Sequence, residues 1–222
     1  MKAEILISPM STTLLTESIP FEEHPLYEAI ISDLLKQSFA ICDSFFEDEV
    51  VQHLRANLQT LYEADNLKKA AIGNRVNESI QKNIRGDYIR WIDEQHSSPA
   101  EILFFEKILD FKSYLNTTCF MGLLHQEFHY AVYPKGTFYK KHIDTFQNDD
   151  RRKLSMVCYL NDSSWQVSNG GELVLYPEHQ PEVIIYPFPG RVVVFESQYL
   201  AHEVKEVKND KRLSITGWLK TS

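Results

Sequence analysis

Several features that would point to a function are scarce in this chain of 222 residues. Its three cysteines, Cys42, Cys119 and Cys158, are widely spaced and form neither a disulfide framework nor a CxxC zinc pattern. No stretch approaches the roughly 18 consecutive apolar residues that a transmembrane helix needs. Residues 1–18 also make a poor signal peptide, because their apolar run is short and broken. We therefore expect a cytoplasmic protein with reduced thiols and no membrane partner.

Positive charge is scarce as well. Lys and Arg number 23 against 31 Asp and Glu, which gives a formal net charge of −8 at pH 7. A nucleic-acid-binding surface is usually basic, so we expect no nucleic acid partner. The chain also lacks a glycine-rich phosphate loop and a nucleophile elbow, which removes two common kinds of catalytic site.

Helical periodicity dominates the first half of the chain. Apolar residues recur at helical spacing after Pro25 and again from Val50. The segment 98–101, Ser-Pro-Ala-Glu, is a capping box with proline at the first helical position, so a helix should begin there. That helix is expected to bury Ile102 and Phe105.

From residue 125 onward, short β-favouring runs are separated by turn signals such as Gly170-Gly171. The predicted strands are 127–133, 137–144, 153–160, 171–176, 182–186, 191–197, 201–207 and 212–219, with 84–92 as a further candidate. This number of short strands favours a sandwich or barrel. We therefore expect a single domain over 1–222, with mainly helical support in 1–124 and the β core in 125–222.

A basic segment, 68–85, interrupts the helical half. It holds Lys68, Lys69, Arg75, Lys82 and Arg85 against a single acid, and it lacks strong periodicity. Such a segment is typical either of a solvated basic loop or of a loop that closes over a substrate. If the second interpretation holds, the substrate loop spans about 68–92.

Two histidines and one aspartate form the pattern that indicates chemistry. His142 and Asp144 lie two apart in the strand expected over 137–144, so their side chains should share a face. His202 begins a later strand, and two strands facing each other across a barrel mouth can bring the three together. Two imidazoles and one carboxylate on one face of a metal leave the other positions open, as in non-haem Fe(II) oxygenases. Zinc accepts the same ligands, so the ligand set alone does not name the metal.

Arg212 and Ser214 are also two apart on an expected strand and should face one way. A guanidinium binds a carboxylate through two parallel hydrogen bonds, and a neighbouring hydroxyl can add a third. A dicarboxylate co-substrate whose other end chelates the metal would need such a group. This pair therefore favours Fe(II) with 2-oxoglutarate over zinc.

His125 and His129 form a second histidine pair, at the spacing of a zincin helix. A zincin needs Glu directly after the first His, and this chain has Gln126 there. The segment also resembles a strand. We therefore do not expect a metalloprotease.

Longer motifs surround these residues: Gly136-Thr137-Phe138-Tyr139-Lys140-Lys141-His142-Ile143-Asp144, Cys158-Tyr159-Leu160-Asn161, Gly170-Gly171-Glu172-Leu173, His202-Glu203-Val204 and Arg212-Leu213-Ser214-Ile215-Thr216-Gly217-Trp218. Together they resemble the 2-oxoglutarate- and Fe(II)-dependent prolyl hydroxylases. The similarity is greatest to the branch of the hypoxia-inducible-factor prolyl hydroxylases and their bacterial relatives. Upstream, Ile84-Arg85-Gly86-Asp87 with Trp91 is similar as well, so the resemblance covers most of residues 40–220.

The resemblance implies a mainly β fold, a double-stranded β-helix (jelly-roll, cupin-like) with the N-terminal helices packed on the larger sheet. It also implies roles: iron ligands His142, Asp144 and His202; 2-oxoglutarate-binding residues Arg212, Tyr159, Tyr133, Ser214 and Thr216; and substrate-binding residues Arg85, Asp87 and Trp218. The segment 84–91, with the basic loop before it, resembles the substrate-covering finger of the family.

The activity that the resemblance implies is hydroxylation of a prolyl residue in a protein, with release of succinate and CO2. Ascorbate is a further candidate cofactor, and a translation factor or ribosomal protein is a candidate substrate. Three alternatives stay open: a hydroxylase of a free amino acid or small metabolite, an oxygen or 2-oxoglutarate sensor that acts by binding a partner, and a structural zinc protein. The last would lose its metal only by unfolding.

Overall fold

The computed structural model describes residues 22–70, 84–145 and 150–222. Its elements, in chain order, are α1 (Pro25–Gln37), β1 (Phe39–Cys42), α2 (Asp48–Glu63), β2 (Lys68–Lys69), β3 (Tyr88–Trp91), the 3-10 helix η1 (Glu94–His96), α3 (Pro99–Cys119), β4 (His125–Pro134), β5 (Tyr139–His142), β6 (Arg152–Tyr159), the 3-10 helix η2 (Val167–Asn169), β7 (Leu173–Tyr176), β8 (Val183–Ile185), β9 (Val192–Glu196), β10 (Ala201–Val204) and β11 (Lys211–Lys220). Each of the eight strands predicted after residue 125 has a counterpart.

None of the helices in these described residues has the length and apolar character needed to cross a membrane.

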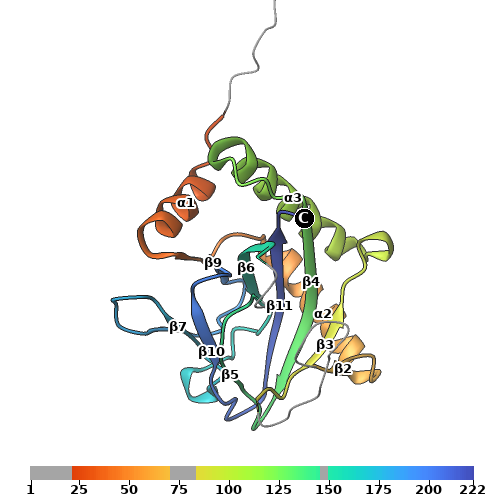
Figure 1. Cartoon of the computed structure of the whole chain (residues 1–222). Helices are drawn as coiled ribbons and strands as arrows, with labels where there is room; N and C mark the ends of the chain where they lie inside the picture. The colour runs from red at the N-terminus through yellow and green to blue at the C-terminus, as the bar shows by residue number, and fades with distance from the viewer. Residues whose placement is uncertain (1–21, 71–83, 146–149) are drawn as a thin grey trace, which may run out of the picture.

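Two antiparallel sheets form the core of the fold (Figure 1). The larger has the strand order β1-β9-β6-β11-β4-β3-β2, and the smaller has β5-β10-β7-β8. Apolar side chains such as Val157, Leu175 and Phe195 form a buried cluster between them. The expected jelly-roll of mainly β structure is confirmed.

The larger sheet is buried on both faces, because helices cover its outer side. Alternate residues of a strand point to opposite faces. In β6, Val157 therefore packs between the sheets, whereas Met156 and Cys158 join Leu54 and Phe104 of the helices in a second cluster. Strands buried on both faces read as continuous apolar runs, which explains why this half of the chain shows little clean alternation.

Helix α3 begins at the expected capping box. The Ser98 backbone N–H donates to Glu101 Oε2 at 2.7 Å, and the Glu101 N–H donates to Ser98 Oγ at 3.4 Å. The helix buries Phe105 as predicted, along with Phe104, but Ile102 is 48% exposed and that prediction is wrong. Ile102 lies about 200° around the helix from Phe104, on the side away from the sheet.

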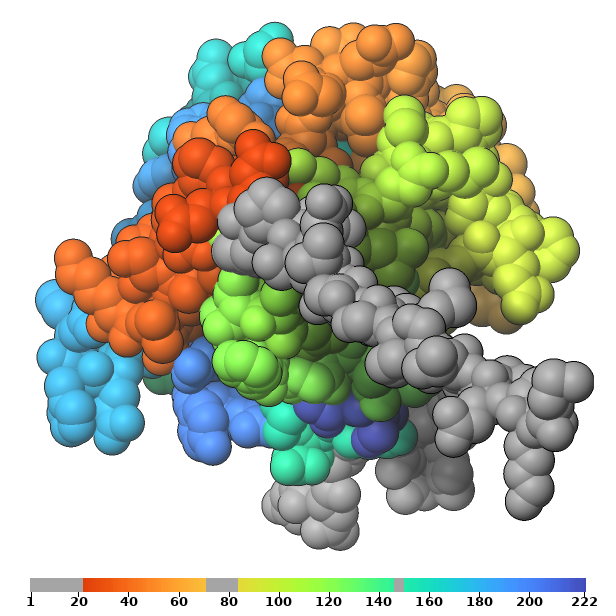
Figure 2. Space-filling model, turned by 90° about the horizontal axis from the view of Figure 1, so that it is seen from above, coloured from red at the N-terminus to blue at the C-terminus, as the bar shows by residue number. Residues whose placement is uncertain are grey.

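The helices form a common layer on the outer side of the larger sheet. Tyr27 of α1 donates its hydroxyl to Asp110 of α3 at 2.7 Å, and the His24 N–H donates to Tyr114 Oη at 3.1 Å. Seen from above in Figure 2, the red-to-orange residues of α1 and α2 and the yellow-green to green residues of α3 make up much of the surface. The face of the larger sheet that carries polar residues therefore points the other way, toward the smaller sheet.

Candidate active site

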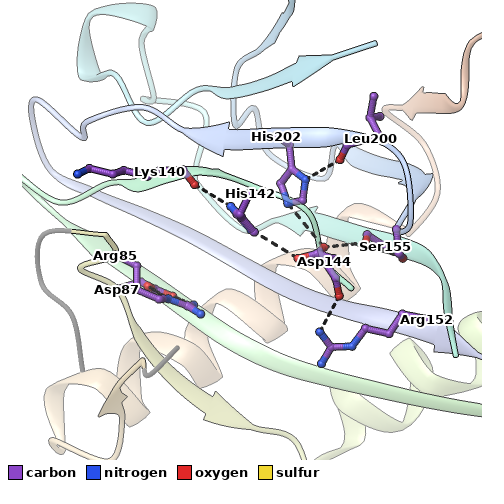
Figure 3. A network of polar contacts seen from close by, with 10 residues as sticks. Arg85, Asp87, Lys140, His142, Asp144, Arg152, Ser155, Leu200 and His202 are labelled. Atoms are coloured by element: carbon purple, nitrogen blue, oxygen red, sulfur yellow. Dashed lines mark hydrogen bonds and ion pairs between the residues drawn. The ribbon is translucent and has the colours of Figure 1, made fainter. Parts of the chain in front are cut away.

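His142 and His202 come together because their strands pair. His142 ends β5 and is the register partner of His202 on β10, so the two ring centroids lie 4.2 Å apart. Asp144 follows two residues later. One ligand atom from each of the three residues lies within 4.8 Å of the others, and this is the one such group of three or more within the described ranges. Figure 3 shows the three side chains converging on one point.

The strand expected over 137–144 is shorter than predicted. β5 ends at His142, so Asp144 lies in a bend and strand alternation does not explain its position. Side chains from β6 hold it instead. Ser155 donates its hydroxyl to Asp144 Oδ2 at 2.7 Å, and Arg152 Nη1 donates to the Asp144 carbonyl oxygen at 3.0 Å (Figure 3). A second hydroxyl, that of Ser197, lies 2.8 Å from Ser155 Oγ.

Both imidazoles present the same nitrogen to the centre of the group. His142 Nδ1 lies 2.7 Å from the Lys140 carbonyl oxygen, and His202 Nδ1 lies 3.1 Å from that of Leu200. A carbonyl only accepts, so each Nδ1 carries a proton and each Nε2 is the nitrogen left to face a metal. Those Nε2 atoms lie 3.5 and 3.6 Å from the Asp144 carboxylate oxygens. Such backbone contacts are the usual way in which proteins orient metal-binding histidines.

The charge states also suit a divalent cation. Burial alone would raise the pKa of Asp144, but the neighbouring His202 and His142 rings and the Ser155 hydroxyl more than offset it, so the pKa lies well below its ordinary range. Burial lowers the pKa of His202 to about 4. At neutral pH Asp144 is therefore a carboxylate and His202 a neutral imidazole, the forms in which these residues bind a metal.

A cavity of about 560 Å³ opens beside these three residues, between the two sheets. Its floor is the inner face of β11, where Arg212, Thr216 and Trp218 line the cavity and Ser214, on the same face, lies behind the lining. The register with β4 places Arg212 opposite Tyr133 at one end of this row and Thr216 opposite His129 further along. The cavity thus has an Arg212 end and a Trp218 end, with the His-Asp-His group between the sheets.

The Arg212 end is built for an anion. Arg212 is 2% exposed, and no carboxylate pairs with it among the described residues. Its Nη1 donates to Ser214 Oγ at 3.2 Å, while its Nε and the Tyr159 hydroxyl are buried without a hydrogen-bond partner in the described part of the chain. Burying an unpaired charge is costly unless a ligand of opposite charge pairs with it. A carboxylate fits this position, as 2-oxoglutarate would supply.

The Trp218 end is aromatic. Trp91 of β3 is 51% exposed and lies 6.3 Å from Trp218 between ring centroids. The Arg152 guanidinium stacks 3.6 Å above the Trp218 ring and pairs with Glu127 at 2.8 Å. His129 packs against both indoles, 4.9 Å from Trp91 and 5.6 Å from Trp218 between ring centroids. Flat apolar faces beside a fixed guanidinium suit an apolar residue flanked by peptide carbonyls.

The other predicted site residues divide into those that line the cavity and those behind it. The lining includes Tyr133, Thr216, Trp218 and Arg85, whereas Tyr159, Ser214 and Asp87 lie outside it. Asp87 has a side chain that is 0% exposed and that Arg85 binds through both carboxylate oxygens. Lys68 and Lys69 of the basic segment line the cavity, while 71–83 lie outside the described residues.

Sequence patterns assign no role to four residues of this site: His129, Tyr139, Arg152 and Ser155. In the sequence His129 is notable only as a partner of His125, which lies at the far end of β4 beside Lys220. His129 and Tyr133 are four residues apart on one strand, so their side chains point to the same face of the sheet. This spacing is the signal by which the sequence could have placed His129 in the cavity. Arg152 and Ser155 act on Asp144 across strands, which no local pattern reveals.

Comparisons with known proteins identify the family. Residues 128–220 match the family model described as the 2OG-Fe(II) oxygenase superfamily. A solved prolyl-4-hydroxylase of Pseudomonas putida is 32% identical, and the match covers 89% of this chain and 100% of that chain at a TM-score of 0.80. A prolyl hydroxylase of Trichoplax adhaerens, solved with a hypoxia inducible factor oxygen degradation domain peptide fragment, is 26% identical, covers 88% of this chain and 89% of that chain, and has the same TM-score of 0.80.

Curated relatives extend the comparison. The hypoxia-inducible factor prolyl hydroxylase of Caenorhabditis elegans is 26% identical over 210 residues, which is 86% of this chain and 28% of that protein. This chain spans about a third of the first two curated relatives that it matches, 36% and 28% of their lengths. With the jelly-roll fold, the His-Asp-His group and the match to the P. putida enzyme established, this chain belongs to the 2-oxoglutarate- and Fe(II)-dependent oxygenases, a family that uses Fe(II) and 2-oxoglutarate, and its relatives include prolyl hydroxylases.

Proposed function

We propose that this protein hydroxylates a prolyl residue within a protein substrate. In this proposal His142, Asp144 and His202 hold Fe(II), and Arg212 binds the 5-carboxylate of 2-oxoglutarate. The metal and co-substrate supply the oxidising chemistry, with succinate and CO2 as co-products, while the protein orients the substrate. The Tyr159 ring and the Ser214 hydroxyl support Arg212 from behind, Tyr133 lines the same end, and Thr216 lines the cavity further along β11.

The observation that carries the proposal is the division of the cavity into an anion end and an aromatic end. A pyrrolidine ring packs well against indole faces such as those of Trp218 and Trp91. Arg152 is held by Glu127 with its guanidinium at the same mouth, where it can donate to a peptide carbonyl. The half-exposed Trp91 leaves this end accessible to a polypeptide, and the T. adhaerens enzyme was solved with a peptide.

The competing substrate is a free amino acid or small metabolite. Free proline carries an ammonium and a carboxylate, and its recognition would need a counter-ion for each at the aromatic end. Among the described lining residues the one carboxylate is Asp144, which belongs to the proposed metal group, so the ammonium would lack a counter-ion. A peptide, whose amides are neutral, fits this lining better.

The test can begin before any particular substrate protein is identified. Protein reconstituted with Fe(II) and 2-oxoglutarate under isotopically labelled O2 would be offered a proline-centred peptide library, soluble proteins enriched in translation factors and ribosomal proteins, and free L-proline. We expect labelled hydroxyproline in a peptide or protein, detected by mass spectrometry, and none with His142→Ala. Labelled free hydroxyproline alone would replace the protein substrate with a small one.

Two further outcomes would overturn the enzyme proposal itself. Partner binding that depends on 2-oxoglutarate, without any hydroxylated product, would favour a sensor. Tightly bound zinc, whose removal unfolds the protein, would favour a structural metal site. Metal analysis and thermal unfolding with and without chelator separate these outcomes.

A further inference from the structure

Arg85 belongs to a column of stacked groups that ends on the proposed metal ligand His142. The Arg85 guanidinium carbon lies 4.3 Å from the centroid of the Tyr139 ring. The Tyr139 ring stacks on His142 with centroids 3.6 Å apart and planes 18° apart. The residue that sequence similarity places at the substrate entrance is therefore in contact, through one ring, with the metal group.

Asp87 fixes the outer end of this column. Arg85 Nε donates to Asp87 Oδ1 at 2.8 Å, and Arg85 Nη2 donates to Oδ2 at 2.6 Å. The two side chains are 13% and 0% exposed. A buried bidentate pair of this kind holds the plane of the guanidinium, so the cation presents its face to Tyr139.

The backbone holds the column together as well. The Gly86 N–H donates to the Phe138 carbonyl at 3.0 Å, and the Lys140 N–H donates to the Ile84 carbonyl at 2.9 Å. Residues 84–86 thus run beside β5, the strand that carries His142. The approach is close, because a Cβ on Gly86 would lie 2.8 Å from Thr137 Cβ. Residues 84–87 cannot shift without disturbing that strand.

We infer that Arg85 is a positioning residue for the His142 imidazole, acting through the ring of Tyr139. The inference rests on the proposed function, since it takes His142 as a metal ligand. The hydrogen bond from Nδ1 to the Lys140 carbonyl fixes one edge of the imidazole. The stack with Tyr139 fixes its plane, and together they hold Nε2 toward the metal position. Partners of this kind commonly change metal affinity by about 10- to 100-fold.

Whether removing Arg85 weakens or tightens metal binding distinguishes a positioning role from a purely electrostatic one. Arg85 is a cation close to a site proposed for another cation. If it acted through charge alone, its removal would relieve repulsion and tighten metal binding. If it positions His142, its removal weakens metal binding and changes the ligand geometry.

Co(II) titration of the metal-free 222-residue chain tests this, because the visible absorption of bound Co(II) reports ligand geometry as well as affinity. The variants are Arg85→Gln, Tyr139→Leu and both together, with Tyr139→Phe as the matched control that keeps the ring. We add Arg85→Gln/Asp87→Asn, which leaves no buried carboxylate unpaired. Thermal unfolding of each metal-free variant reports general damage to the fold.

We expect Arg85→Gln and Tyr139→Leu each to weaken Co(II) binding about 10-fold and to alter the absorption band, with no further loss in the double variant. Tyr139→Phe should stay within about twofold of the unsubstituted protein, because the stack is kept. Unchanged or tighter binding in both Arg85 variants, or a lowered melting temperature with an unaltered band, would overturn the inference alone. Failure of the unsubstituted protein to bind Co(II) would overturn the metal site and the inference with it.

Discussion

The neutral, buried His129 makes the stability of the metal-free protein depend on pH. The residue is 3% exposed, and its Nδ1 is buried without a hydrogen-bond partner in the described part of the chain. Burial lowers its pKa to about 4 from an ordinary value of 6.5, and the cations of Arg85 and Arg152 add to this effect. Protonating His129 in the folded protein therefore costs more than protonating it in the unfolded chain.

The sign follows from that difference. Because the folded pKa lies below the unfolded one, the unfolded state binds more protons between pH 6.5 and about 4, so stability falls as the pH drops through this range. Each pKa unit corresponds to about 1.4 kcal/mol. Going from pH 7 to pH 5 crosses about 1.5 units of the gap, so His129 should remove about 2 kcal/mol from the free energy of unfolding.

Urea unfolding of chelator-treated protein at pH 7 and pH 5 measures this loss. The comparison is between the unsubstituted protein and His129→Gln, whose loss should be smaller by about 2 kcal/mol. Other histidines, including His202, contribute to both proteins and cancel in the difference. His179→Gln is the control, because that side chain is 88% exposed and should leave the full loss in place. Equal losses in all three proteins would refute the assignment of a neutral, buried His129.

Three other changes test the site and the sheet beneath it. His142→Ala should abolish Fe(II) binding, measured by metal analysis, and 2-oxoglutarate turnover, whereas His125→Ala should keep both; turnover surviving in His142→Ala would contradict the proposed ligand set. Arg212→Lys keeps the positive charge but loses the two parallel N–H donors of the guanidinium, so the 2-oxoglutarate concentration for half-saturation should rise about 100-fold with metal affinity unchanged. A half-saturation concentration equal to that of the unsubstituted protein would remove Arg212 from the co-substrate site. Gly217→Ala should lower the free energy of unfolding by about 3 kcal/mol, because the added Cβ would collide with the Phe128 ring and the Glu127 carbonyl oxygen. Gly122→Ala, where φ is +64° and nothing lies within 4 Å of the added Cβ, should cost only about 1 kcal/mol in a urea titration.

Local patterns were sufficient for the elements and for part of the site. The capping box at Ser98 specifies a helix start through contacts three residues apart, and it appears where expected. The eight β runs were recognisable because strand residues and turn residues alternate along the chain. Arg212 and Ser214 share a face because a strand repeats every two residues, and in the structure Arg212 donates to Ser214.

Long-range pairing decided the rest. Asp144 lies beyond its strand, and its position depends on Ser155 and Arg152, which come from another strand. The stack of Arg85 on Tyr139 likewise joins residues that only sheet pairing brings together.

The chain by itself determined which residues could bind a metal and a dicarboxylate, because residue type and two-residue spacing are local properties. Tertiary structure decided that His202 and His142 are paired on neighbouring antiparallel strands. It also decided that Arg212 is buried without a carboxylate partner among the described residues. Periodicity shows which face a side chain occupies, but not which strand lies opposite. That choice depends on packing summed over the whole core, and here it turns scattered polar residues into one cavity.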